Sequence, residues 1–201
     1  PLIAEQAIPF ARELSILAAR DQSGTIDLYP LTENRHEDGI LRRSVAPATE
    51  GAPAIEQQAR AWATRLLPDR DYVGLLAIEC FEHEGPLLAN ETAMRVHNSG
   101  HWTLDGARSS QFTTHVRAVI GDPLSSLARG ARSSVMLNLI GALPTPAQRR
   151  ALLAIPGLAL HLYGKGPRPG RKLGHATITA NTHEQARAHA DDAERILAGD
   201  A

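Results

Sequence analysis

The chain has 201 residues, of which 43% are hydrophobic and 21% are charged, values that are ordinary for a soluble globular protein. Its formal net charge of −1 gives no global field that would favour nucleic acid or a membrane surface. The sequence has neither an apolar run of membrane-spanning length nor a signal peptide. Its single cysteine, Cys80, excludes a disulfide within the chain and fits a reducing cytoplasm.

The first residue is Pro1, which opens directly into an apolar segment, so we expect the C-terminal part of a longer polypeptide. Hydrophobic periodicity and turn residues predict a mixture of strands and helices, an α+β fold. In chain order the predicted elements are an extended segment at 2–8, strands at 12–20 and 25–30, a polar loop at 33–39, a Pro/Ala-rich loop at 47–53, a helix at 54–67, strands at 72–81 and 87–91, a helix at 109–120, a strand at 134–139, a helix at 146–153, strands at 158–163 and 173–179, and an exposed closing helix at 182–197.

Two of the predicted helices carry apolar residues at helical spacing, which we interpret as stripes that face the core. They are Ile55, Ala59, Trp62 and Leu66 in the first helix, and Phe112, Val116, Val119 and Ile120 in the second.

The strand at 72–81 is apolar on both faces, so we expect it to be covered on both. His83–Pro86 is a turn signal, and the segment 87–91 is predicted to return as the second strand of a hairpin. In a hairpin folded symmetrically about that turn, Glu79 and Glu91 face each other with Cβ atoms roughly 5 Å apart. Two opposed carboxylates repel, and a hard divalent cation such as Mg²⁺ would relieve the repulsion. An arginine partner and a slipped register are the alternatives.

The stretch Asn90–Trp102 holds a carboxylate, amides, a guanidinium, two imidazoles and an indole within thirteen residues. Buried strands and helices are not built this way, because each buried polar group would need a partner of its own. The stretch begins where an apolar run ends, which is where active sites commonly lie. We therefore expect functional chemistry at this edge of the fold.

A second candidate is the loop Gly164–Lys172, in which Lys165, Arg168, Arg171 and Lys172 place four cations within eight residues. Arginine grips a phosphate in a forked geometry and lysine adds a point charge, so such a loop can bind a phosphate. A nucleic-acid loop is disfavoured, because no aromatic residues interleave with the cations. By sequence pattern alone a solvated turn remains the alternative.

Several segments together resemble one enzyme family, the 5-(carboxyamino)imidazole ribonucleotide synthases, which are ATP-grasp ligases of purine synthesis. The resemblance covers nearly the whole chain. It rests on Phe10–Ser15, Glu33–His36, Glu79–Phe81, Asn90–Glu91, Arg95–Thr103, Ser109–Phe112, Val135–Gly141 and Arg168–His175.

The resemblance implies an ATP-grasp core of mixed or antiparallel sheet with flanking helices in residues 1–122, and a small C-terminal α/β domain in 123–201. The family's N-terminal domain and phosphate-covering lid precede the segment that matches this chain. We therefore expect the chain by itself to be weakly active or inactive. The resemblance also implies a homodimer.

The implied reaction is the carboxylation of 5-aminoimidazole ribonucleotide by bicarbonate, with ATP as the phosphoryl donor and Mg²⁺ as the metal. The roles that the resemblance carries over divide among nucleotide, metal, reacting groups and substrate phosphate. They are Glu5 to Ile8 for adenine, Glu13 for the ribose, His36 and Asn90 near the nucleotide, Glu79 and Glu91 for the metal, Arg95 and His97 for catalysis, His101 and Trp102 for pocket shape, and Lys165, Arg171 and Lys172 for the ribonucleotide phosphate.

Two other functions remain open at this point. A different ATP-grasp ligase, such as a formate-using purine enzyme or a biotin carboxylase, would share the two metal glutamates but not the segment Arg95–Trp102. A non-catalytic module would use the basic loop to bind a phosphorylated metabolite without turnover.

Overall fold

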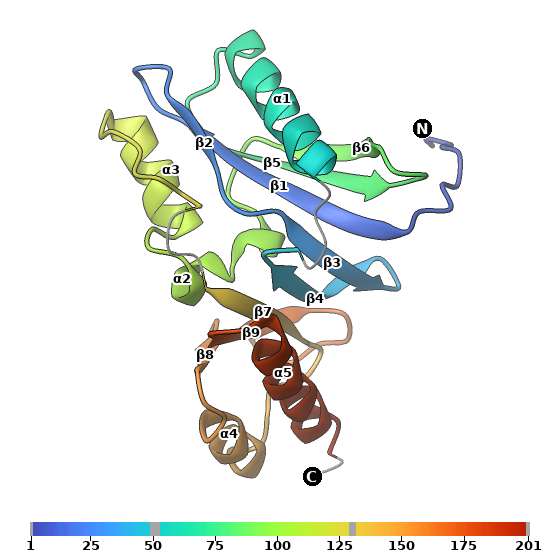
Figure 1. The fold of residues 1–201 in the computed structure, drawn as a ribbon. Helices are drawn as coiled ribbons and strands as arrows, with labels where there is room; N and C mark the ends of the chain where they lie inside the picture. The colour runs from blue at the N-terminus through green and yellow to red at the C-terminus, as the bar shows by residue number, and fades with distance from the viewer. Residues whose placement is uncertain (1, 49–52, 129–131, 200–201) are drawn as a thin grey trace.

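The computed structural model describes residues 2–48, 53–128 and 132–199, which form a curved sheet with helices on its faces (Figure 1). The strands are β1 (Arg12–Arg20), β2 (Ile26–Leu28), β3 (Thr32–Glu37), β4 (Ile40–Ala46), β5 (Gly74–Glu82), β6 (Leu87–Ala93), β7 (Ser133–Ile140), β8 (Leu158–Leu162) and β9 (Lys172–Ala180). The helices are α1 (Pro53–Asp69), α2 (Thr103–Gly106), α3 (Gln111–Ile120), α4 (Pro146–Leu153) and α5 (His183–Ala198), and a single 3₁₀ turn lies at Asn98–Gly100.

The strands of the described residues all belong to one sheet in the order β6-β5-β1-β3-β4-β7-β9-β8, and β2 pairs with β1 beside this path. The paired strands are antiparallel throughout. The sheet therefore continues from β4 into β7, across the boundary at residues 122 and 123 that the sequence suggested. The division into two domains at that point stays a prediction.

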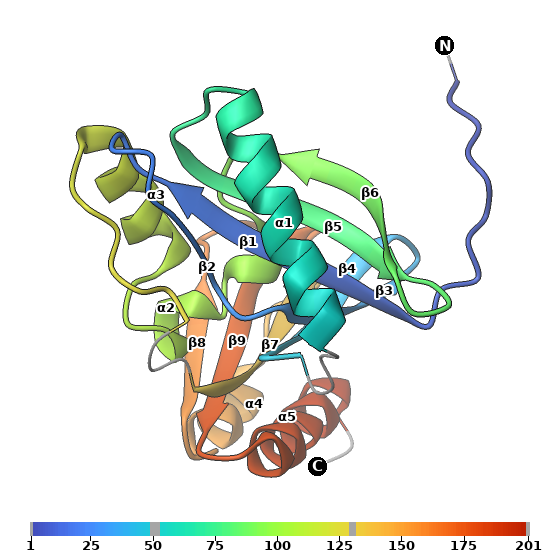
Figure 2. The same ribbon diagram turned by 45° about the horizontal axis from the view of Figure 1, so that its top comes forward.

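Alternation along β1 and β5 explains how the sheet is covered on both faces. The even-numbered side chains of both strands, such as Leu14 and Ile78, pack with α1 in one core cluster. The odd-numbered ones, such as Leu17 and Leu75, pack with Trp102 in a second cluster. This confirms that the strand predicted at 72–81 is covered on both faces. Figure 2 shows α1 lying across β1 and β5.

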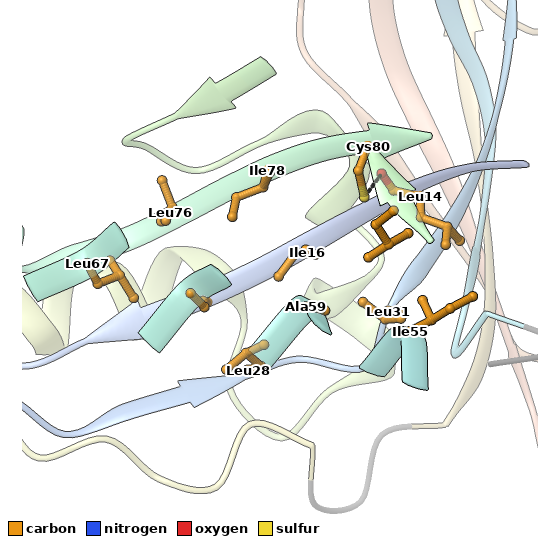
Figure 3. Packing of buried hydrophobic residues seen from close by; sticks show 13 residues of the cluster. Leu14, Ile16, Leu28, Leu31, Ile55, Ala59, Leu67, Leu76, Ile78 and Cys80 are labelled. Atoms are coloured by element: carbon orange, nitrogen blue, oxygen red, sulfur yellow. Dashed lines mark hydrogen bonds between the residues drawn. The ribbon is translucent and has the colours of Figure 1, made fainter. Parts of the chain in front are cut away.

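The first cluster sets the position of α1 on the sheet. Figure 3 shows Leu14 and Ile16 of β1 next to Ile55 and Ala59 of the helix. Cys80 belongs to the same cluster, and its thiol donates to the carbonyl of Leu14 at 3.3 Å. Because burial raises the pKa of this thiol to about 12, Cys80 is a packing residue and not a nucleophile at neutral pH.

Trp102 lies in the second cluster and is fully buried, and its indole N–H donates to Thr32 Oγ1 at 3.0 Å. Trp102 itself does not line the cleft that contains Glu79 and Glu91, so it can shape a pocket only through the residues it holds in place, and that role stays a prediction. Its side chain anchors the segment 97–103 to the sheet, and this fixes where the neighbouring polar residues lie.

One predicted loop is a strand in the structure. The polar loop predicted at 33–39 is mostly strand β3, which turns at Asp38 and Gly39 into β4. Strand β3 alternates buried and exposed polar residues, so it lacks the apolar alternation by which a strand is recognised. Part of the Pro/Ala-rich loop predicted at 47–53 lies outside the described residues.

Helix α3 faces the core with a different side from the predicted one. Val116, Val119 and Ile120 are exposed, at 55%, 47% and 66%. The buried residues are Gln111, Thr114 and Ala118. The predicted core-facing stripe is wrong because polar contacts hold this helix in place, and a pattern of hydrophobic residues does not reveal them.

Helix α5 was expected to be exposed, but its alanine side is buried. Ala186, Ala190 and Ala193 pack on β7 and β9 in a third core cluster with Leu152 of α4. Small side chains allow a close approach of helix and sheet. None of the described helices has the length and apolar character needed to cross a lipid bilayer.

Candidate active site

The hairpin of β5 and β6 places the two predicted metal carboxylates opposite each other. The register pairs Glu79 with Glu91, as the sequence predicted. Near the turn, however, Glu82 pairs with Leu87 and Cys80 with Ala89, so regular pairing would bring Asn90 opposite Glu79. A β-bulge after Glu79 takes up one residue and restores the pair.

These carboxylates line a cleft of 410 Å³ on the face of the sheet opposite α1. Several predicted site residues meet there. The lining residues are Glu13, His36, Gly39, Leu41, Glu79, Asn90, Glu91, His97 and Asn98. Glu13 comes from β1, His36 from β3 and Glu79 from β5. Glu13 and Glu79 lie on the same face because the odd-numbered side chains of β1 and β5 share it. Residues far apart in sequence thus converge on one cleft.

Glu79, Glu91 and His97 form a cluster whose ligand atoms all lie within 4.8 Å of one another. The Glu79 side chain is 17% exposed, and His97 Nε2 lies 3.5 Å from its carboxylate. Burial raises the pKa of Glu79, and the charges of Glu91 and Glu13 add to the effect, while His36 and Arg95 oppose it. Two carboxylates and an imidazole at these distances are suitable ligands for a divalent cation.

His97 is neutral at pH 7, because burial lowers its pKa to about 4 and the charges of Arg95, His36 and Lys172 add to the effect. Its contact with Glu79 is therefore not an ion pair at that pH. The Nδ1 atom of His97 meets Ser99 Oγ at 2.9 Å. Neutral His97 thus has one ring nitrogen that donates and one that accepts a hydrogen bond within the cleft.

Glu13 and His36 form the other end of the cleft. His36 Nδ1 lies 3.0 Å from Glu13 Oε2, and the backbone N–H of His36 donates to the same oxygen at 3.4 Å. His36 is therefore held by a strand and a carboxylate and is not the freely solvated group that its sequence context allows. In the same strand, buried Asn34 bridges Ser15 and Ser44 by hydrogen bonds of 2.7 and 2.8 Å.

The basic loop reaches the cleft through its last residue. The ammonium of Lys172 contacts the side-chain oxygen of Asn98. Burial lowers the pKa of Lys172 to about 7, and the charge of Lys165 adds to the effect. Lys165 and Lys172 each lie 5.6 Å from the ring centre of Tyr163, on opposite ends of the loop. Arg171 donates to the carbonyl of Gly166 at 3.5 Å within the loop.

The remaining predicted site residues lie outside this convergence. Arg95 is exposed and donates to the carbonyl of Val96 at 3.0 Å, although its charge acts on Glu79 and His97. Glu5 is exposed and Ile8 half-buried in the segment before β1, which runs away from the sheet in Figure 2.

Gln111 was not predicted as a site residue, yet it holds the segment 97–103 in place. It is fully buried, accepts the N–H of His97 at 2.9 Å, and donates to the carbonyl of His97 at 2.7 Å. Its amide also lies 3.2 Å from His101 Nδ1. A Cβ on Gly100 would approach the Gln111 side chain to 2.5 Å, so only glycine fits beside it. Gln111 lies within Ser109–Phe112, one of the segments that carry the family resemblance, but nothing in a sequence indicates such a bracing contact.

Replacing Gln111 with alanine is expected to lower the free energy of unfolding by about 3 kcal/mol, because two buried backbone groups of His97 lose their partners. Urea denaturation measures the loss, with exposed Gln185→Ala in α5 as the matched control. Equal stability of the two variants would contradict the bracing role.

The raised pKa of Glu79 also predicts how stability depends on pH in the metal-free chain. The folded state binds the Glu79 proton more tightly than the unfolded state does, so the contribution of Glu79 to the free energy of unfolding should fall as pH rises above the ordinary carboxyl pKa of 4.5. The buried histidines, whose pKa values are lowered, contribute with the opposite sign, so the contribution of Glu79 is measured as the difference in slope between the parent and Glu79→Gln, by denaturation across that pH range with a chelator present. An unchanged slope would show that Glu79 ionises normally in the folded chain.

Comparison with known proteins agrees with this architecture. The ATP-grasp domain family model matches residues 1–112, and the phosphoribosylaminoimidazole carboxylase C-terminal domain model matches residues 134–189. The chain belongs to the ATP-grasp family.

Within that family, the chain is similar to N5-carboxyaminoimidazole ribonucleotide synthases. It is 45% identical to the Pseudomonas aeruginosa enzyme over 98% of this chain and 53% of that protein. It is 45% identical to the Escherichia coli enzyme over 88% of this chain and 48% of that protein. The chain thus spans about half the length of the curated relatives it matches.

Solved structures give the same result. The Thermus thermophilus synthetase superimposes with a TM-score of 0.90 at 47% identity, over 96% of this chain and 52% of that one. The Aspergillus clavatus synthase in complex with ADP and 5-aminoimidazole ribonucleotide gives 0.87 at 34% identity, over 96% and 53%.

Proposed function

We propose that this chain supplies the metal carboxylates and part of the ribonucleotide site of an ATP-dependent ligase that carboxylates 5-aminoimidazole ribonucleotide. The observation that carries the proposal is the cleft that gathers Glu13, Glu79, Glu91 and His97 on one sheet face. In this reaction the γ-phosphoryl group of ATP passes to bicarbonate, which gives carboxyphosphate and ADP. The amine of the ribonucleotide then bonds to the carboxyl carbon, and inorganic phosphate leaves.

The donor set of the cleft fits Mg²⁺. Glu79 and Glu91 offer hard oxygen ligands, and their mutual repulsion in a half-buried site leaves them in need of a cation. Asn90 also lines this cleft. When bound, Mg²⁺ would offset the negative charge of the ATP phosphates.

Arg95 and His97 are the proposed catalytic residues. Arg95 is exposed and so free to turn toward an anion, and a guanidinium would stabilise the charge of carboxyphosphate. Neutral His97 would move a proton or orient the carboxyl unit. Phosphoryl transfer asks the protein mainly for positioning and charge stabilisation, which these residues supply.

The nucleotide and the ribonucleotide would bind at opposite sides of the carboxylates. Glu13 can accept two hydrogen bonds from a ribose diol, His36 holds that carboxylate, and the backbone from Glu5 to Ile8 would meet adenine. Lys165, Arg171 and Lys172 would hold the ribonucleotide phosphate. The complex of the Aspergillus clavatus relative with ADP and 5-aminoimidazole ribonucleotide supports this pairing of ligands.

We further propose that the active enzyme is a cytoplasmic homodimer in which the chain is joined to the rest of an ATP-grasp polypeptide. The relatives support the second part, because each is about twice as long as the region matched. By itself the chain should show little or no turnover.

The test joins this chain to the part of the Pseudomonas aeruginosa relative that lies outside the matched region. ADP release is then measured with ATP, bicarbonate and 5-aminoimidazole ribonucleotide, and again with each one left out. Turnover that needs all three supports the proposal. Turnover with formate in place of bicarbonate, or ribonucleotide binding without any turnover, would contradict it.

A further inference from the structure

A second polar cluster lies away from the carboxylate cleft, where α2 meets the hairpin of β8 and β9. It consists of Asp105 from α2, His161 from β8 and His175 from β9. One ligand atom from each residue lies within 4.8 Å of the other two. His161 and His175 are directly paired across the two strands, and their rings stack with centres 4.5 Å apart. Three residues distant in sequence thus bring together side chains of the kinds that commonly bind metal ions.

The burial of His175 distinguishes this cluster from a surface ion pair. Its side chain is only 1% exposed, and its Nδ1 lies 2.6 Å from the hydroxyl of Tyr163. Its Nε2 is buried and has no hydrogen-bond partner among the residues that the structure describes. An unsatisfied buried nitrogen is costly, so such an atom indicates a missing ligand.

The contact with Tyr163 favours a ligand role for that nitrogen. When Nδ1–H donates to the tyrosine oxygen, Nε2 keeps its lone pair, and a ring nitrogen of His175 lies within 4.8 Å of ligand atoms of Asp105 and His161. Metal-binding histidines are commonly held this way by a hydrogen bond on the other ring nitrogen. Burial lowers the pKa of His175, with His101, His161 and Lys172 adding to the effect, so the ring is neutral at pH 7.

We propose that Asp105, His161 and His175 bind a divalent transition-metal ion of the Zn²⁺ class. Two imidazoles and a carboxylate suit such an ion, whereas Mg²⁺ prefers oxygen ligands alone. Three protein ligands leave a fourth position open on the side where His161 and Asp105 reach solvent, at 34% and 23% exposure. None of the three residues lines the cleft of Glu79 and Glu91, and the site does not depend on the proposed ligase function.

Binding requires a small, local rearrangement. Ligands of a tetrahedral zinc ion lie about 3.3 Å apart, given bonds of about 2.0 Å, so Asp105 Oδ2 and His161 Nε2 must separate from 2.9 Å. The stacked rings are nearly parallel, at 13°, so His161 must also turn for its lone pair to meet the ion. His161 is half-buried, and its side chain makes one hydrogen bond, to Asp105, and one stacking contact, with His175, both to residues of the proposed site itself.

Co²⁺ absorption spectroscopy on the 201-residue chain tests the proposal, because tetrahedral Co²⁺ absorbs visible light. The titration uses Glu79→Gln/Glu91→Gln as the background, since the carboxylate cleft also contains a histidine. We expect about one equivalent of Co²⁺ to bind, with displacement by Zn²⁺. Asp105→Asn and His161→Asn should each weaken binding about 100-fold, and Tyr163→Phe about tenfold.

Zn²⁺ should also raise the melting temperature of the chain, because it would join α2 to the β8–β9 hairpin, and a chelator should reverse the rise. His83→Asn, in the β5–β6 turn, is the matched control and should bind like the parent. The absence of visible absorption bands, or equal affinity in the parent and in Asp105→Asn and His161→Asn, would overturn the proposal. Circular dichroism of each variant checks that a loss of binding is not a loss of fold.

Discussion

Replacing Glu79 with glutamine is expected to lower the turnover of the assembled ligase roughly 10³-fold. The side chain keeps its shape but loses the charge that, with Glu91, would hold the metal on the ATP phosphates. Because the metal offsets charge that develops during phosphoryl transfer, the loss should appear in kcat more than in the KM of the ribonucleotide. Steady-state ADP release by the joined polypeptide measures both constants.

Glu84→Gln is the control, since Glu84 lies exposed in the turn of the same hairpin. It removes one negative charge nearby without touching the cleft, so turnover should stay within about twofold of the parent, given that surface substitutions usually have small effects. If Glu79→Gln turned over as fast as Glu84→Gln, the metal role of the hairpin would be wrong, whatever the fate of the ribonucleotide site.

The Glu79–Glu91 pair shows how far sequence reasoning reaches in this fold. Counting outward from the turn predicted the right pair, but the strands reach it only through a bulge after Glu79. Turn residues and apolar runs are visible in a sequence, whereas a bulge depends on how the whole sheet twists. The sequence thus predicted the hairpin on physical grounds. The predicted pairing of Glu79 with Glu91 was correct only because the bulge, which the sequence did not reveal, shifts the register by one residue.

Elements held by polar contacts were predicted less well than elements held by apolar ones. β1 and β5 show buried hydrophobic runs and were found at nearly their true bounds. β3 was predicted as a loop because its residues Thr32 and Asn34 are buried by hydrogen bonding and not by hydrophobicity. Helix α3 was placed correctly but assigned the wrong buried side for the same reason.

The residues of the cleft were predicted from the family resemblance as much as from sequence patterns. The proximity of Glu13 and His36 to the carboxylates follows from the order of β5, β1 and β3 in the sheet. Strand order is a tertiary property, and a single sequence indicates it only weakly. Gln111 and Asn98 were missed as functional positions because their roles lie in contacts with distant residues, His97 and Lys172.

Half-buried Lys172 is expected to change its protonation state when a phosphate binds. Its pKa of about 7 leaves the amine mostly uncharged at pH 8. A bound phosphate dianion favours the ammonium form, so ribonucleotide binding at pH 8 should take up close to one proton. Lys172→Met should abolish the uptake and weaken binding about 100-fold, the size expected on removing one member of a buried charge pair.

Calorimetry of the joined polypeptide in two buffers with different ionisation enthalpies gives the proton count and the affinity together. Arg150→Met on α4 removes an exposed positive charge remote from the loop and should change neither. Lys165→Met should weaken binding less than Lys172→Met, since Lys165 is exposed and the lysine that contacts Asn98 is not. Proton uptake that survives in Lys172→Met would assign the titrating group to another residue and remove Lys172 from the phosphate site.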